Sequence, residues 1–326
     1  VFGMDPLLNM AALLFAGLLF SRLIKLLKLP NVTGFLVGGL IIGPSVLGLL
    51  STQGVESLGL ISSVALGFIA FSIGSEFKIS YFKRVGSLPI VIATFESLFA
   101  VVFVVAALAA AGQTLPFSLV LGAIAAATAP AATIMVIKQY RAKGPVTETL
   151  LSVVALDDAT ALIFFGIAVA IAQALESPQH ASLLFSVLSP VLQILAALGI
   201  GLALGAAHTL LIRFLPARHN RLVLTIAFVL TATAVAELLG LSALLTTMAM
   251  GAVFANFCKQ SAQVMELTDR FTNPIYMMFF VLSGAGLNLS ILPSIGLVGV
   301  IYVVVRVLGK MGGAWFGATL MHGPAE

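Results

Sequence analysis

The 326-residue chain is too apolar and too poor in charge for a soluble globular protein. Hydrophobic residues make up 60% of it and charged residues 9%, with a mean hydropathy of +1.17, whereas about a quarter of the residues of a soluble domain are charged. The net charge is +4, and Cys258 is the single cysteine, which excludes a disulfide framework and a cysteine-ligated metal site.

Eleven apolar segments, each about long enough to cross a membrane, follow one another along the chain. The first begins directly after VFGMDP, which lacks the basic region of a cleaved signal peptide, so none is expected. We therefore predict an all-α polytopic membrane protein that is a single transmembrane unit over residues 1–326. The segments are 6–27, 31–50, 55–77, 86–111, 116–138, 146–174, 183–214, 220–239, 242–258, 268–288 and 292–320.

Positive charge is confined to alternate loops. Except for Arg306 and Lys310, all 16 Lys and Arg residues follow or flank the connections after segments 1, 3, 5, 7 and 9. The positive-inside rule places these five loops in the cytoplasm, the N-terminus outside and the end of this chain in the cytoplasm. Because the basic residues are spread over five loops, the pI near 9.4 indicates membrane topology and no nucleic-acid partner.

Segment 5 contains the stretch AAATAPAATIM, which predicts an interrupted helix. Pro130 removes a backbone donor and clashes with the preceding turn, and Thr128 offers a hydroxyl beside the break at Ala129. A proline kink without a ligand role is the alternative. Broken helices at the membrane midplane are typical of the binding sites of secondary transporters.

Segment 6 carries two adjacent carboxylates, Asp157 and Asp158, about 17 Å of helical rise from its polar start. Ionisable residues at the bilayer midplane mark ion or proton pathways. An intramembrane aspartyl protease also uses two aspartates, but its carboxyl groups face each other about 3 Å apart, whereas neighbours on one helix diverge. A cation channel is the stronger alternative, although no filter sequence resembling TVGYG occurs.

An internal repeat relates two segment ends. Residues 74–80 read GSEFKIS and residues 284–290 read GAGLNLS, an offset of 210, and the charge pattern gives segments 3 and 10 opposite orientations. Inverted repeats are a property of transporters.

Segment 11 holds Arg306 and Lys310, which share one helical face. Lys310 lies about ten residues from the inner end, a long reach for snorkelling. Glu96 in segment 4 precedes Arg306 by the same 210 residues, so we predict a Glu96–Arg306 ion pair that braces the structure without carrying the ion.

Four stretches resemble the monovalent cation:proton antiporter-2 family. They are LPNVTGFLVGGLIIGPSVLGLL, ATAPAATIMVIKQYRAKGPVTETLLSVVALDDA, NPIYMMFFVLSGAGLNLS and VLGKMGG. The resemblance implies a bacterial inner-membrane antiporter, similar to the electrogenic two-aspartate Na+/H+ exchangers, that forms a homodimer in the lipid bilayer and is not an enzyme. A K+/H+ antiporter or a gated K+ efflux system is the alternative within the family, and no cofactor is implied.

The family architecture implies a scaffold and a mobile core. Residues 1–85 and 220–288 correspond to the dimerisation part, 86–174 and 292–326 to the ion-translocation core, and 183–214 to the linking helix. Two departures stand out: some relatives have an aspartate where this chain has Ala129, and the sequence ends after the eleventh segment of about 13.

The chemistry of a buried carboxylate gives each site residue an expected role. Desolvation favours its neutral form, so a midplane carboxylate can hold a proton and release it to an incoming cation. We assign Asp158 as the main carrier of proton and monovalent cation, with Thr128 as a further ligand. Asp157 points about 100° away around the helix and is expected to pair with Lys310, as in the family.

Overall fold

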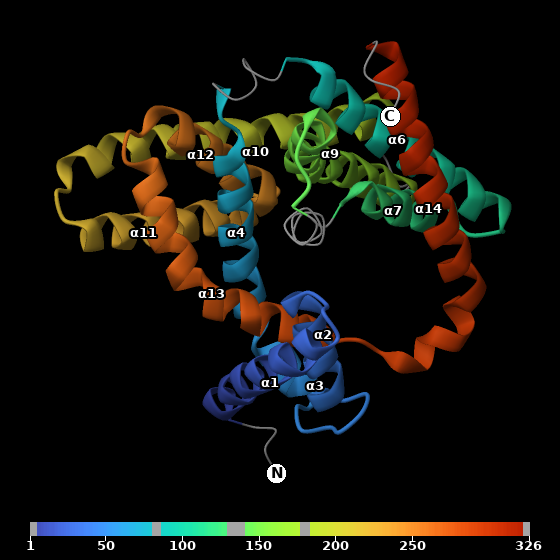
Figure 1. Cartoon of the computed structure of the whole chain (residues 1–326), viewed down its shortest axis with the longest axis horizontal. Coiled ribbons are helices and arrows are strands. Elements are labelled where there is room, and N and C mark those ends of the chain that lie inside the picture. Colours follow the sequence, from blue (N-terminus) through green and yellow to red (C-terminus); the bar gives the residue numbers. More distant parts are fainter. Residues whose placement is uncertain (1–4, 80–85, 129–140, 177–182, 322–326) are drawn as a thin grey trace.

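The computed structural model describes residues 5–79, 86–128, 141–176 and 183–321, and these form helices without a strand. Figure 1 shows their arrangement. The α-helices are α1 (Pro6–Leu26), α2 (Asn31–Ile42), α3 (Thr52–Ser57), α4 (Gly59–Glu76), α6 (Leu88–Ala110), α7 (Leu115–Ala126), α9 (Pro145–Glu176), α10 (Leu183–Leu211), α11 (Arg218–Leu238), α12 (Ala243–Phe257), α13 (Ser261–Ala285) and α14 (Leu292–Leu320), and Ile212–Phe214 and Leu289–Ile291 are short 3-10 helices.

Each of the eleven predicted segments corresponds to a helix or helix pair. The third differs, because Ser51 caps the short α3 by accepting a hydrogen bond from the Gly54 amide, and α4 begins separately at Gly59. Among the described helices, five are long and apolar enough to cross a membrane and four more are apolar but shorter. The prediction of an all-α polytopic membrane protein is therefore confirmed.

The helices pack in two groups. Helices α6, α7, α9 and α14 contact one another and lie toward the right of Figure 1, while α4 and α10 to α13 lie toward the left. The pair α1 and α2 packs on the second group through α13. Helix α10 contacts both α9 and α12, so it joins the two groups.

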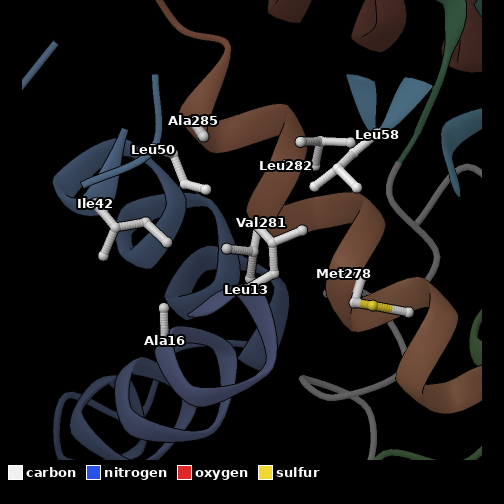
Figure 2. Packing of buried hydrophobic residues seen from close by; sticks show 9 residues of the cluster. All are labelled: Leu13, Ala16, Ile42, Leu50, Leu58, Met278, Val281, Leu282 and Ala285. Atoms are coloured by element: carbon white, nitrogen blue, oxygen red, sulfur yellow. The ribbon is translucent and has the colours of Figure 1, made fainter. Parts of the chain in front are cut away.

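Apolar side chains of α1, α2 and α13 build one of the cores. Figure 2 shows Leu13, Ile42 and Val281 converging between these helices. Leu13 and Val281 are fully buried, and in a bilayer such contacts stabilise the helices by van der Waals packing, not by removal from water. This packing fixes the position of α13 relative to the N-terminal helices.

The internal repeat appears in the packing as a pair of equivalent backbone contacts. A Cβ on Gly74 would stand 2.9 Å from Cα of Met248, and a Cβ on Gly284 would stand 2.9 Å from Cα of Leu36. Gly284 follows Gly74 by 210 residues, and Met248 follows Leu36 by 212. The crossing of α4 with α12 is therefore repeated by the crossing of α13 with α2.

A second pair of contacts follows the same offsets. Gly39 of α2 lies against α13, where its Cβ would stand 2.8 Å from the Ala285 nitrogen. Gly251 of α12 lies against α4, where its Cβ would stand 3.1 Å from the Ser75 nitrogen. The repeated sequence thus encodes two helix crossings at which the backbones touch.

Helices α6 and α14 pack antiparallel through a line of glycines on α14. A Cβ on Gly309 would stand 2.9 Å from Cα of Ala100, and one on Gly313 would stand 2.7 Å from Cα of Glu96. The small residues let the two backbones approach closely. This register places Lys310 beside Glu96.

Candidate functional site

Lys310 of α14 is the centre of a cluster of polar side chains from α6, α9, α14 and the segment just after α7. Its ammonium nitrogen lies 2.9 Å from Oδ2 of Asp157, 3.1 Å from Oε1 of Glu96 and 2.6 Å from Oγ1 of Thr128. The Lys310 side chain is 13% exposed, that of Glu96 16% and that of Asp157 1%. The predicted pairing of Lys310 with Asp157 is present.

All three N–H groups of Lys310 have hydrogen-bond acceptors in this cluster. A lysine ammonium has three N–H groups and no acceptor, and Lys310 donates to Asp157, Glu96 and Thr128. The Thr128 hydroxyl accepts from Lys310 and donates its own proton to Oδ2 of Asp157. Thr128 therefore links the end of α7 to both charged partners.

Asp157 is held by a third donor that sequence reasoning missed. Ser97 of α6 donates to Oδ1 of Asp157 at 2.7 Å, and its hydroxyl lies 2.9 Å from that of Thr160. Thr160 in turn donates to the backbone oxygen of Asp157. The available signals were weak: Ser97 follows Glu96 in an otherwise apolar helix, and Thr160 stands three residues after Asp157, close to the same helical face.

The interruption of segment 5 begins before Pro130. Helix α7 ends at Ala126, and Ala127 has an extended backbone with φ −61° and ψ 144°. Arg306 of α14 donates to the carbonyl oxygens of Ala125 and Ala127, at 3.0 and 2.5 Å. A cation at a helix C-terminus satisfies carbonyls without partners and offsets the negative end of the helix dipole.

The predicted Glu96–Arg306 ion pair is wrong. Glu96 pairs with Lys310, and Arg306 pairs with the end of α7. The antiparallel register explains the error. Gly313 lies beside Glu96, and Arg306 comes seven residues before Gly313, so its backbone is displaced from the level of Glu96 by roughly 10 Å along α14. A shared offset in sequence does not place repeat-equivalent residues opposite each other in an antiparallel pair.

Three predicted site residues lie partly or wholly outside the described residues. The backbone of Asp158 lies in α9, but its side chain is outside the described part of the structure, and so are Ala129 and Pro130. Their assignment as ion carrier and helix break stays a prediction. Asp157, Thr128, Lys310, Glu96 and Arg306 are all brought together where α6, α7, α9 and α14 meet.

An ion pair buried beside the end of a helix, in an all-helical protein with apolar helices long enough to cross a membrane, is typical of secondary transporters. The chain belongs to the transmembrane sodium/hydrogen exchanger family, whose description, "Sodium/hydrogen exchanger, transmembrane", it matches over residues 10–325. It is therefore a multi-pass membrane protein of a family of cation/proton antiporters. The resemblance noted in the sequence is confirmed at this level.

Solved structures of one antiporter share the fold. The structure of the sodium proton antiporter MjNhaP1 from Methanocaldococcus jannaschii at pH 8 has a TM-score of 0.77 and 21% identity, covering 96% of this chain and 78% of that one. A structure of the same antiporter from an electron microscopy map has a TM-score of 0.74 and 20% identity, and the match covers 95% of this chain and 76% of that one. Comparison with proteins of curated function gives no match.

Proposed function

We propose that this chain exchanges Na+ for protons by alternating access, with Asp158 as the residue that binds the cation and the proton in turn. The observation that carries the proposal is the buried Lys310–Asp157 ion pair, joined by Thr128 and Glu96. Family membership supplies the class of reaction, and the sodium specificity follows the family description and the similar antiporter.

The cluster supports a competition between a proton and a cation for the same carboxylates. Asp158 follows Asp157 directly in α9, so its side chain leaves the helix about 100° away from the ion pair. A bare cation needs several oxygen ligands when it leaves water. In the proposed site, the Asp158 carboxylate and the Thr128 hydroxyl would supply two of these ligands.

Lys310 gives the exchange a second charge to move. A cation bound near Asp157 provides that carboxylate with a new counter-ion, which weakens its hold on the Lys310 ammonium. If the ammonium then releases a proton together with the one from Asp158, two protons exchange for one cation. Each cycle then transfers one net positive charge, which makes the antiport electrogenic.

The packing groups suggest which parts move. We propose that α6, α7, α9 and α14 form the mobile core, within residues 86–174 and 292–326, and that 1–85 and 220–288 form the scaffold, with 183–214 as the linking helix. The two groups meet chiefly through α10, and few direct contacts between two bodies favour relative motion. The scaffold would also form the homodimer interface, in a bacterial inner membrane with the N-terminus outside.

Transport in proteoliposomes tests the proposal. An imposed pH gradient should drive Na+ uphill, and jumps of Na+, Li+ and K+ on a solid-supported membrane should give currents whose sign follows the cation gradient at several pH values. Larger currents with K+ than with Na+ would favour a K+/H+ antiporter. Flux that runs only downhill and ignores the pH gradient would indicate a channel.

A further inference from the structure

A cavity outside the ion-pair cluster lies between α10 and α12. Its volume is about 530 Å³, and its lining includes Leu202, Ala206 and Thr209 of α10, Arg213 just after α10, and Val253 and Phe257 of α12. The residues from the α10 side are spaced four, three and four apart, so they share one helical face. Leu202 is 50% and Phe257 62% exposed, so in a membrane protein the cavity opens toward the bilayer.

Thr209 gives this cavity an unused polar group. Its hydroxyl oxygen is buried, yet it has no hydrogen-bond partner among the residues that the structure describes. Threonines in neighbouring α11 donate instead to the carbonyl one turn earlier, as Thr225 and Thr233 do, which is the usual solution within a helix. A buried hydroxyl without a partner costs free energy, and rotation of the Thr209 side chain toward the cavity would let a ligand oxygen remove that cost.

Arg213 gives the cavity a charged end. Its side chain is exposed, Arg218 and Arg221 lie in the first turn of α11, and Lys259 lies between α12 and α13. Arg221 is already engaged by the carbonyl of Leu215 and by Gln263. A guanidinium group binds phosphate oxygens with two parallel hydrogen bonds, and an apolar lining on the bilayer side suits an acyl chain.

We propose that this groove binds an anionic phospholipid, with its phosphate at Arg213, an ester oxygen at Thr209, and an acyl chain along Leu202, Ala206 and Val253. The charge pattern favours a lipid over a second copy of this chain. A partner related by two-fold symmetry would bring its own copies of these basic residues to this level, and like charges would repel. A lipid phosphate compensates them.

Lipid binding to the intact chain tests the site. In detergent, phosphatidylglycerol and phosphatidylcholine with the same acyl chains are titrated and bound lipids are counted by native mass spectrometry. We expect one tightly retained phosphatidylglycerol and about a tenfold weaker affinity in Arg213→Gln, the effect of one charge-assisted contact. Thr209→Val should weaken binding less, and Arg22→Gln, which removes an exposed charge from α1, should leave it unchanged.

Thermal unfolding provides an independent readout, because a ligand of the folded state raises its stability. At the same lipid concentration, phosphatidylglycerol should raise the melting temperature of the wild type more than that of Arg213→Gln. Equal affinity for the two lipids, or an Arg213→Gln variant that binds phosphatidylglycerol as the wild type does, would overturn the proposal. So would an Ala206→Phe variant that keeps its lipid while its dimer dissociates, since a second copy would then occupy the groove.

Discussion

Lys310 and Asp157 form an ion pair with an N–O distance of 2.9 Å, and the carboxylate side chain is 1% exposed. Desolvating two charges costs several kcal/mol each, so such a pair adds little to stability compared with apolar residues of the same size. Its presence in the packed core of a membrane protein is therefore better explained by transport than by folding.

Removing one partner of this pair should destabilise the protein. Lys310→Ala leaves Asp157 buried without its counter-ion, and we expect a loss of about 3–5 kcal/mol, with a shifted pH profile of exchange. Unfolding in detergent and transport at several pH values measure the two effects. The control is Arg270→Ala, which removes an exposed pair with Glu266 and should change stability by about 0.5 kcal/mol or less. Unchanged melting and pH profile in Lys310→Ala would show that Lys310 only snorkels.

Double-mutant cycles should distinguish the partner of Glu96. Glu96→Gln combined with Lys310→Gln should show a coupling energy of about 0.5–3 kcal/mol, because the two side chains are in contact. Glu96→Gln combined with Arg306→Gln should show a smaller coupling energy, because Arg306 bonds to backbone carbonyls and Glu96 bonds to Lys310. Strong coupling in the second cycle and none in the first would contradict the register of α6 and α14.

Neutralising the proposed carrier should abolish exchange without unfolding the protein. Asp158→Asn keeps the shape of the side chain and removes its titratable charge, so we expect no cation-coupled proton movement in liposomes. The matched control is Glu237→Gln at the exposed end of α11, which should transport normally. Exchange near the wild-type rate in Asp158→Asn would remove this residue from the site.

Arg306 should position Thr128 through the end of α7. Arg306→Gln removes the fork that binds the carbonyls of Ala125 and Ala127, and we expect a loss of about 1–3 kcal/mol and a raised Na+ KM. Arg306→Lys keeps the charge and should partly restore both the stability and the Na+ KM. The recovery is incomplete because an ammonium cannot reproduce the planar fork. Faster amide hydrogen exchange confined to the last turn of α7 would report the loosened end. Amide hydrogen exchange in the last turn of α7 at the wild-type rate, together with an unchanged Na+ KM in Arg306→Gln, would show that Arg306 does not position Thr128.

The two repeated crossings should tolerate no side chain. Gly39→Ala and Gly251→Ala each place a methyl group against the backbone of the facing helix, so we expect a loss of about 1–3 kcal/mol or more and a low folded yield. Gly199→Ala is the control, because nothing lies within 4 Å of its Cβ position and alanine favours a helix by about 1 kcal/mol. Similar yields for all three variants would argue against direct backbone contact.

The membrane architecture could be predicted from the sequence because bilayer thickness and loop charge leave few choices. Segment bounds such as 292–320 and 146–174 lie within two residues of the observed helix ends, since a transition from apolar to polar residues is visible in one dimension. The break between α3 and α4 was missed because the predicted segment 55–77 runs across Leu58 and Gly59 without interruption, and only the Ser51 cap reveals the separate turn.

The site could be predicted only in part, because packing decides which charged residues meet. The pairing of Lys310 with Asp157 was expected from the family resemblance, whereas the contact of Lys310 with Glu96 depends on the register that Gly309 and Gly313 set between α14 and α6. Arg306 as a helix cap was not predictable, since its acceptors are backbone carbonyls that leave no trace in side-chain identity.

The crossings at Gly39 and Gly251 also have a mechanical consequence. Where two backbones touch, no rotamer can adjust and no flexible chain can be compressed, so each crossing behaves as a stiff joint. A shift of one packing group relative to the other requires that the second group keeps its shape. The two glycine contacts therefore stiffen the group that contains α2, α4, α12 and α13, which the proposed mechanism requires to stay fixed while the core moves.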